Sequence, residues 1–157
     1  MAFGKPRYAS MDGILLQDRL PLPEEWEELR RTTNWGDRTT DEYRIALQGT
    51  LFGVCALDGQ KIVAMARVVG DGALCFQIQD VIVDPSYQGK GIGTMVIEHL
   101  LEAIQTSALP NSSVYLFASK GKEAFYRRFG FLDRPCEDCG PGMALCAANI
   151  IYPNRCK

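Results

Sequence analysis

The chain has 157 residues, of which 46% are hydrophobic and 23% charged, and its formal net charge is −2. This balance is typical of a globular protein, and the lack of a basic excess argues against nucleic acid as a partner. No apolar stretch approaches the roughly 18 residues that a membrane span needs, and residues 1–10 lack the apolar core of a secretory signal. We therefore expect a cytoplasmic protein without a membrane partner.

The first third of the chain predicts one strand and two helices. Residues 12–18 are typical of a short strand, and residues 24–32 form a predicted helix with acids in its first turn and arginines near its end. A second helix is predicted over residues 40–47. Thr40 is its expected N-cap and Gly49 its expected stop.

Three strands are predicted in close succession over residues 51–57, 61–69 and 73–83. The first two are joined at Asp58-Gly59, which is a strong hairpin signal. Connections this short join antiparallel strands, so we expect an antiparallel meander.

The rest of the chain alternates helices and strands. Apolar residues at helical spacing predict a helix over residues 94–107, and a short apolar strand follows at 114–118. This strand returns through a helix, so it should lie parallel to its neighbour. A short helix at 122–129 and strand candidates around Phe131 and at 143–148 complete the chain.

This order of elements predicts an α/β fold with a mixed central sheet and helices on both faces. No boundary in composition divides the chain, so a single domain is expected over residues 1–157.

Six cysteines are present, at positions 55, 75, 136, 139, 146 and 156. Cys55 and Cys75 stand in apolar strand-like runs, where small buried thiols are usual. Cys136 and Cys139 form a single CxxC pair. A structural zinc site usually needs four ligands, and no further cysteine or histidine has matching spacing. A redox CxxC opens a helix after a strand, which this pair does not. Free thiols and no metal are therefore favoured.

A glycine-rich segment lies between the third strand of the meander and the long helix. Gly89, Gly91 and Gly93 alternate with other residues there. Glycine lets the backbone approach a ligand closely, and N–H groups at a helix N-terminus cradle an anion such as a diphosphate. The spacing GxGxG differs from the dinucleotide-binding GxGxxG, and the Gly89-Lys90 step lacks the following hydroxyl residue of a P-loop. A plain glycine-rich turn is the alternative.

The run Gln-Gly-Lys-Gly-Ile-Gly over residues 88–93 resembles the signature Q/R-x-x-G-x-G/A of the GNAT N-acetyltransferase superfamily. In that family the loop amides bind the pyrophosphate of CoA, and the pantetheine arm lies where the preceding strand splays from its neighbour. The resemblance implies acetyl-CoA as the cofactor and backbone contacts from the strand. The cofactor-binding residues that it implies are Val81, Ile82, Val83, Gln88, Gly89, Lys90, Gly91, Ile92, Gly93, Thr94, Ser119 and Tyr126.

The run Ala-Phe-Tyr-Arg-Arg-Phe-Gly-Phe over residues 124–131 resembles the second hallmark of the same family. The resemblance places Tyr126 near the cofactor sulfur. A phenol stays protonated at neutral pH and can give its proton to the departing thiolate. The alternative is an aromatic packed in the core. Upstream the match is imperfect, because Ser119 and Lys122 replace the usual Asn and Ala.

The base that removes the amine proton is less apparent. The positions aligned with the family's usual Glu or His are Gln77 and Gln79, which cannot titrate. Asp80 is the only acid within the strand, so it is a candidate base or amine anchor, with a strand bulge deciding which face it occupies. The alternative is that Asp80 caps the strand or orients the loop. We expect His99, on the long helix, at the surface.

The resemblance covers about residues 50–135 and extends to small bacterial GNAT proteins and plant serotonin N-acetyltransferases. It implies direct attack by a primary amine, an arylalkylamine among the candidates, in a ternary complex. Trp26, Trp35 and Tyr43 could line the amine site or simply pack the helices onto the sheet. An acyl-CoA-binding module without transfer activity and a protein lysine or N-terminal acetyltransferase are alternatives. Many relatives pair, so a homodimer stays open.

Overall fold

The computed structural model describes residues 10–11 and 13–144 of the chain. The chain divides into two compact units, residues 1–117 and residues 118–157. The first unit holds the sheet and the longer helices, and the described part of the second holds one short helix and one tight hairpin. The single domain expected over residues 1–157 stays a prediction, since a compact unit need not fold alone.

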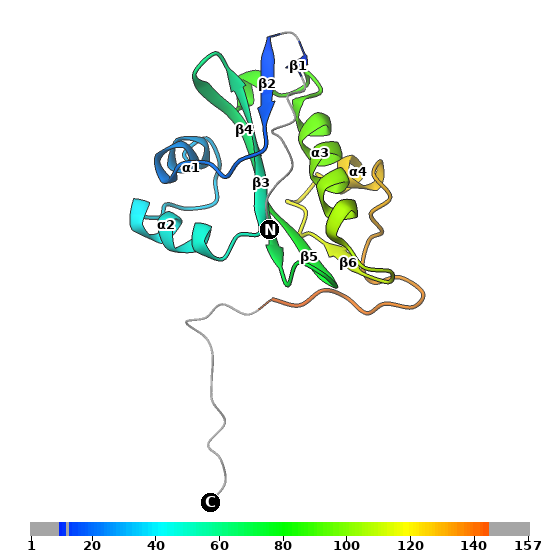
Figure 1. Ribbon diagram of the computed structural model, residues 1–157. Helices are drawn as coiled ribbons and strands as arrows, with labels where there is room; N and C mark the ends of the chain where they lie inside the picture. Colours follow the sequence, from blue (N-terminus) through cyan, green and yellow to red (C-terminus); the bar gives the residue numbers. More distant parts are fainter. Residues whose placement is uncertain (1–9, 12, 145–157) are drawn as a thin grey trace, which may run out of the picture. The chain divides into compact units, whose positions relative to one another are not determined.

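The first unit is built on a six-stranded sheet whose strands follow one another in chain order (Figure 1). All neighbouring strands are antiparallel except β5 and β6, which are parallel. The predicted meander, the parallel return through a helix and the α/β fold class are thereby confirmed. The strands are β1 (Ser10–Met11), β2 (Ile14–Gln17), β3 (Phe52–Asp58), β4 (Lys61–Gly70), β5 (Cys75–Val83) and β6 (Ser113–Tyr115).

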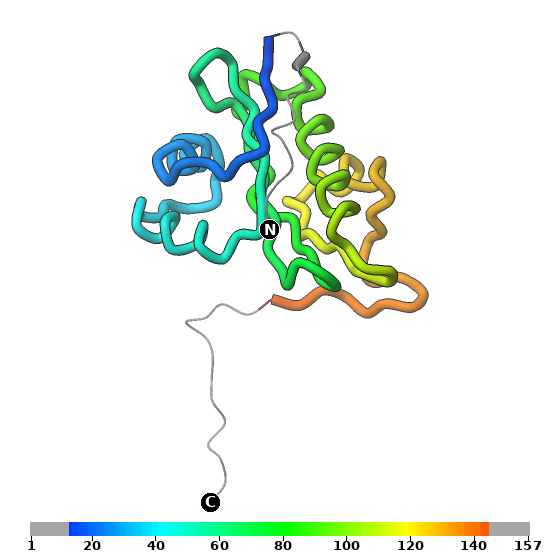
Figure 2. Tube along the Cα trace, in the orientation of Figure 1, coloured from blue at the N-terminus to red at the C-terminus, as the bar shows by residue number. Residues whose placement is uncertain are grey.

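Helices cover both faces of this sheet, as the sequence predicted. Helices α1 (Pro23–Arg30) and α2 (Thr40–Gln48) pack on one face, and α3 (Ile92–Ser107) packs on the other. The chain trace in Figure 2 shows the strands passing between these two layers. In the described part of the chain, no helix has both the length and the apolar composition needed to cross a membrane.

The start of α2 differs by one residue from the sequence expectation. Its N-cap is Thr39, not Thr40, because the Thr39 hydroxyl accepts a hydrogen bond from the N–H of Glu42 at 3.3 Å. The Glu42 carboxylate in turn accepts from the N–H of Thr39 at 2.7 Å. This reciprocal capping box needs a Thr three residues before a Glu, and only Thr39 has that spacing. Gly49 ends the helix as expected.

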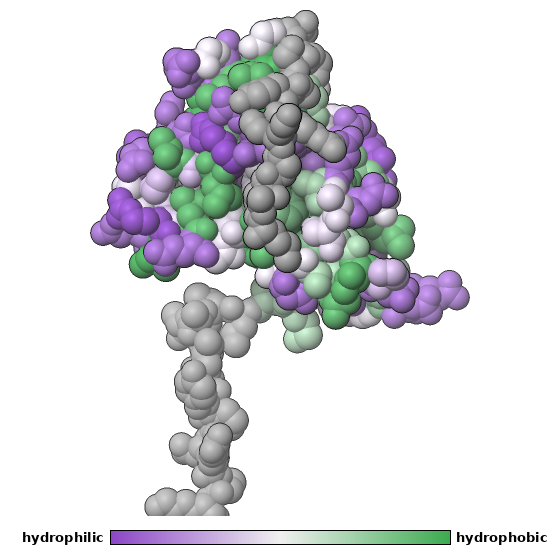
Figure 3. Space-filling view, viewed as in Figure 1, coloured by the Kyte–Doolittle hydropathy of each residue, from purple (hydrophilic) through white to green (hydrophobic). Residues whose placement is uncertain are grey.

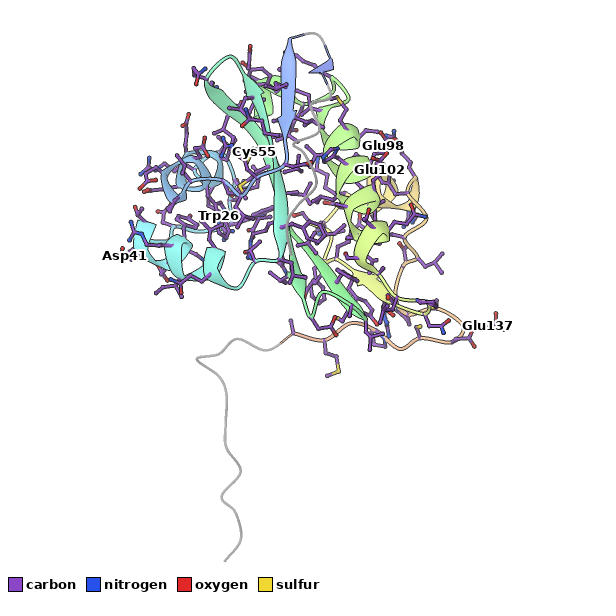
Figure 4. All side chains as sticks on the ribbon, viewed as in Figure 1. Trp26, Asp41, Cys55, Glu98, Glu102 and Glu137 are labelled. Carbon is purple, nitrogen blue, oxygen red and sulfur yellow. The ribbon has the colours of Figure 1, made fainter. Side chains whose placement is uncertain are left out.

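The core has one apolar layer on each side of the sheet. On the side of α1 and α2, Trp26 and Tyr43 stack at a centroid distance of 4.8 Å above a strand layer that includes Cys55 and Met65. Figure 4 shows Trp26 and Cys55 between these helices and β3. The outer side of α1 and α2 is mostly hydrophilic (Figure 3). The buried residues of α3 are Ile92, Val96, Ile97, Leu100 and Ile104.

The turn between β4 and β5 is unusually tight. Gly70 has φ 151°, and a Cβ there would come within 1.9 Å of the carbonyl oxygen of Cys75. The carboxylate of Asp71 accepts from three backbone N–H groups in this turn, which lowers its pKa. Cys75 is exposed at the start of β5, so the expectation of a buried thiol is wrong there and confirmed for Cys55. The strand begins two residues later than predicted, which leaves Cys75 at its rim.

The second unit begins with residues that lead into helix α4 (Glu123–Arg127). Gly130 ends this region with φ 87°, a left-handed conformation that favours glycine. The predicted strand around Phe131 is wrong, because the chain has no regular structure there. The other candidate, at 143–148, lies mostly outside the described residues, and 143–144 form no strand.

Candidate active site

The glycine loop connects the end of β5 to the start of α3. It passes through a short 3-10 turn, η1 (Pro85–Tyr87), and then through Gly89 and Gly91, which have φ 77° and 82°. Both angles lie in the left-handed region, which glycine adopts readily and other residues disfavour, so glycine at these positions allows this loop conformation. Gly91 is the N-cap of α3, and no side chain caps this end. Because helices leave the N–H groups of their first turn without intrahelical partners, the loop presents donors to an anion.

Side-chain contacts stabilise the start of this loop. The carboxylate of Asp84 accepts from the N–H and hydroxyl of Ser86 at 2.9 and 2.6 Å and from Nζ of Lys61 at 2.9 Å. The lysine and serine contacts lower the pKa of Asp84 to about 2. Gln88 donates from Nε2 to the carbonyl oxygen of Val83 at 3.0 Å. The side chain of Gln88 therefore stabilises the turn, which gives a structural reason for a glutamine at this position of the motif.

Tyr87 ties the loop to the hairpin between β3 and β4. Its hydroxyl donates to the Asp58 carboxylate at 2.8 Å, which raises the pKa of Tyr87. The ammonium groups of Lys61 and Lys90 lie 5.3 and 4.8 Å from the centre of its ring, within cation–π range. The loop thus carries the ammonium group of Lys90 beside its N–H donors, and Lys61 of β4 adds a second cation that pairs with Asp84.

The backbone of β5 is open along one edge just before the loop. Strand β6 pairs with β5 only through Cys75, Phe76 and Gln77. Beyond Gln77, no strand in the described part of the chain pairs with that edge, so residues 78–83 present backbone groups there. This stretch includes Val81, Ile82 and Val83, which the sequence predicted as backbone contacts for the pantetheine arm. The side chain of Ile82 is buried in the core, and those of the two valines are half-buried.

A bulge interrupts the pairing of β5 with β4 at Asp80. Arg67 pairs with Gln79 and Met65 with Ile82, so two residues of β5 oppose one of β4. Asp80 itself has φ 49°, a left-handed conformation that Asp tolerates better than most residues. The bulge foreseen from the sequence is present. It turns the Asp80 side chain toward α1.

Two arginines hold the Asp80 carboxylate. Nη1 of Arg30 donates to one oxygen at 3.0 Å, and Nε of Arg67 donates to the other at 2.7 Å. The Asp80 side chain is 8% exposed. Arg67 also donates to the Thr50 hydroxyl at 3.1 Å and lies 4.6 Å from the centre of the Trp26 ring. These contacts support a structural role, the alternative in which Asp80 caps the strand or orients the loop; its role as base or amine anchor stays a prediction.

Sequence reasoning did not foresee the two arginines. Arg30 ends α1 and Arg67 lies in β4, so Arg30 is separated from Asp80 by 50 positions and Arg67 by 13. The only available signal was that an acid inside an apolar strand needs a cationic partner. Nothing in the pattern says which of the basic residues supplies it.

The three aromatics proposed for an amine site behave differently. Trp26 and Tyr43 are 2% and 1% exposed, so they pack the helices onto the sheet, as the alternative stated. Burial raises the pKa of Tyr43. Trp35 is 41% exposed and lies against the guanidinium of Arg30. Of the three, only Trp35 offers a ring to a ligand.

His99 is not a surface residue. Its side chain is 10% exposed, and Nε2 contacts the carboxylate of Asp18. The expectation failed because the partner precedes α1, 81 positions away in the chain. The contact ties α3 to the segment after β2.

The second unit contains Ser119 and Tyr126. The carbonyl oxygen of Ser119 accepts from the N–H of Lys122, the N-cap of α4, at 2.9 Å. The ring of Tyr126 contacts Phe125 and Phe131 edge to face, with centroid distances of 5.0 and 6.2 Å. Burial raises the pKa of the Tyr126 phenol, so the phenol stays protonated at neutral pH. A proton donor needs that state.

Comparisons with known proteins assign the family. The Acetyltransferase (GNAT) family model matches residues 17–131. The chain therefore belongs to the GNAT acetyltransferase family. Among solved structures, a probable acetyltransferase from meticillin-resistant Staphylococcus aureus superposes with a TM-score of 0.77 at 30% identity. The match covers 85% of this chain and 98% of that chain.

Two plant relatives match the chain over shorter stretches. GCN5-related N-acetyltransferase 1, chloroplastic, from Arabidopsis thaliana is 38% identical over 100 residues, which cover 62% of this chain and 50% of the relative. Serotonin N-acetyltransferase 2, chloroplastic, from Oryza sativa subsp. japonica is 39% identical over 83 residues, covering 53% and 40%. The chain thus spans half or less of the length of these relatives. Because both names specify the chloroplast, the cytoplasmic location stays a prediction.

Proposed function

We propose that this chain is an N-acetyltransferase that moves the acetyl group of acetyl-CoA to a primary amine. The observation that carries the proposal is the order of two features along the backbone. The open edge of β5 over residues 78–83 leads through the glycine loop to the uncapped N-terminus of α3. A strand edge suits an extended arm that carries amides, and a helix N-terminus suits a diphosphate. CoA carries both groups in that order.

The residues present fit the cofactor. The first turn of α3 contains no acidic residue, and Gly89 and Gly91 adopt left-handed conformations without side chains that would cover the N–H groups. Lys90 adds positive charge. The remaining residues proposed to hold the cofactor are Val81, Ile82, Val83, Gln88, Ile92, Gly93, Thr94, Ser119 and Tyr126. When bound, acetyl-CoA supplies the acetyl group as a thioester.

Tyr126 supplies the proton that the leaving thiolate needs. Its raised pKa keeps the phenol protonated throughout the neutral range. The sign of the pH effect follows, because activity that depends on the protonated phenol is present below the raised pKa and is lost above it. We expect the alkaline limb of the rate profile to lie above the ordinary tyrosine pKa of about 10.

We propose a small-molecule amine as the acceptor, with an arylalkylamine among the candidates. The similarity to a serotonin N-acetyltransferase supports an arylalkylamine, and the exposed ring of Trp35 is available to it. We propose direct attack by the amine in a ternary complex. We propose Asp80 as the base or amine anchor; the alternative is a structural role through its arginine partners, and an Asp80→Asn substitution separates these roles. An unchanged pH–rate profile excludes Asp80 as the base.

One observation favours a second candidate function. Gln77 and Gln79 cannot titrate, and both oxygens of Asp80 already accept from arginines. A module that binds acyl-CoA without transferring the acyl group needs no base. Such a module would bind the cofactor as tightly as an enzyme, but it would release no thiol when an amine is added.

The test is a transfer assay that follows both free CoA thiol and acetylated product. The full chain is incubated with acetyl-CoA and an arylalkylamine, a polyamine or a lysine-bearing peptide. We expect turnover with at least one small amine, and a fall in kcat of about 100-fold for Tyr126→Phe. The matched control is Tyr115→Phe, which removes a phenol from a partly exposed site on β6. Turnover by Tyr126→Phe within about twofold of the wild type excludes the donor role.

A further inference from the structure

The CxxC pair of the second unit forms a tight hairpin. The N–H of Cys136 donates to the carbonyl oxygen of Cys139 at 2.8 Å, and the N–H of Cys139 donates back to Cys136 at 3.1 Å. The two residues form an antiparallel bridge with only Glu137 and Asp138 between them. Figure 4 shows Glu137 at the outer end of this turn. Sequence pattern did not predict this geometry, because neither strand of the hairpin is longer than one residue.

The hairpin brings the two thiols into range of each other. Residues that exchange both backbone hydrogen bonds lie directly opposite, with their side chains on the same face of the ribbon and Cα atoms about 5.5 Å apart. A disulfide needs a Cα separation of about 4.4 to 6.8 Å. The pair therefore meets the Cα condition, and its Cβ atoms, about 5.5 Å apart in a hydrogen-bonded pair, need to approach by only about 1 Å for the bond to form. Both thiols are free, Cys136 exposed and Cys139 partly buried.

A further hydrogen bond joins the residues that flank the hairpin. Nε of Arg134 donates to the carbonyl oxygen of Gly140 at 2.9 Å, just outside the two cysteines. Since only two residues separate the thiols, joining them orders little additional chain. The pair is thus held in place before any bond forms.

The buried cysteine of the first unit provides a contrast. Burial raises the pKa of the Cys55 thiol to about 12, so its reactive thiolate is scarce at neutral pH. Cys136 and Cys139 lie where solvent and small reagents reach them. Among the described residues, no three His, Cys, Asp or Glu side chains gather as metal ligands, so the described geometry favours a dithiol over a metal centre.

We propose that Cys136 and Cys139 are a redox-active dithiol that small-molecule disulfides convert to an intramolecular disulfide. The thiolate of one cysteine attacks the reagent, whose S–S bond breaks, and a mixed disulfide forms as one reagent thiol leaves. The second cysteine then attacks the sulfur of the first, forming the Cys136–Cys139 bond and releasing the second reagent thiol. Two protein thiols are oxidised, one reagent disulfide is reduced, and the two thiol protons pass to the released thiols.

The experiment treats the reduced full chain with oxidised glutathione and blocks the remaining thiols with N-ethylmaleimide. Cleavage after glutamate cuts between the two cysteines at Glu137, so a disulfide between them holds two peptides together until reduction. We expect this crosslinked pair in the wild type, in Cys146→Ser and in Cys156→Ser. In Cys139→Ser we expect it to be lost and replaced by glutathione bound to Cys136.

Three outcomes would overturn the proposal. The first is that N-ethylmaleimide alkylates both cysteines even after treatment with oxidised glutathione, which would show that no disulfide had formed. The second is that the crosslink to the Cys136 peptide persists in Cys139→Ser, which would assign the bond to another cysteine. The third is stoichiometric zinc in the purified chain that alkylation of Cys136 and Cys139 releases, which would make the hairpin part of a metal centre.

Discussion

Asp80 lies within β5 and Asp84 directly follows that strand, and the two carboxylates anchor the residues between them in different ways. The Asp80 side chain is 8% exposed and lies between the guanidinium groups of Arg30 and Arg67. The Asp84 side chain is 14% exposed, and its cationic partner Lys61 is 47% exposed. One end is therefore fixed from the interior beside α1, and the other is fixed at the solvent-facing hairpin.

We infer from this difference that burial of the cationic partners, more than the number of contacts, sets the energetic cost of losing each anchor. Removing a carboxylate from between two buried guanidinium groups leaves uncompensated charge with little access to water. Removing a carboxylate from beside an exposed ammonium group leaves a charge that water solvates well. Between the two anchors lie residues 81–83, which carry the backbone edge proposed for the cofactor.

The largest effect is expected at the buried anchor. We expect Asp80→Ala to lower the free energy of unfolding by about 3 kcal/mol, measured by urea denaturation, because both arginines lose their counter-ion. Asp80→Gly is the matched variant, since glycine adopts φ 49° without strain. It should be about 1 kcal/mol more stable than the alanine variant. A loss below about 1 kcal/mol in both would show that the ion pairs contribute little.

A smaller effect is expected from changing only the shape of one partner. Arg67→Lys keeps the charge but loses the planar group that contacts Asp80, Thr50 and the Trp26 ring together. We expect a loss of about 1.5 kcal/mol in the same denaturation experiment. Arg31→Lys is the control, because Arg31 is 67% exposed and pairs with Glu27 along one helix. Equal losses in the two variants would contradict the importance of burial.

The smallest effect is expected at the exposed anchor, and it depends on pH. The pKa of Asp84 is lowered from 3.8 to about 2, so the stability that it contributes is present above about pH 4 and is lost as the pH falls toward 2. We expect Asp84→Asn to be about 1 kcal/mol less stable at pH 7. The difference from the wild type should shrink as denaturation is repeated at lower pH. A difference that stays constant down to pH 2 would exclude the ionised carboxylate as its cause.

Local pattern predicted most of the fold. Residues 51–83 contain apolar strands separated by turn residues, and the structure has the expected meander there. The spacing of Gly89, Gly91 and Gly93 likewise predicted an open helix start, because the conformation of a loop depends mainly on its own residues. The N-cap at Thr39 also followed a local rule, once the spacing to Glu42 is considered.

What the sequence did not predict depends on contacts between distant residues. The arginine partners of Asp80 and the Asp18 partner of His99 come from other elements, and no spacing rule links them. The hairpin at Cys136 and Cys139 is too short to show alternation. Tyr126 and the glycine loop belong to different compact units, so the shared role that the family resemblance implies for them stays a prediction.

Calorimetric titration with acetyl-CoA tests whether the loop holds the cofactor pyrophosphate. The wild type is compared with Gly91→Glu and with the control Gly72→Glu, which places the same residue at a similar φ of 78° in the turn before β5, whereas the loop follows that strand. We predict binding by the wild type and by the control, and a loss of at least about 100-fold in affinity for Gly91→Glu. No binding by the wild type, or equal binding by all three proteins, would contradict the claim.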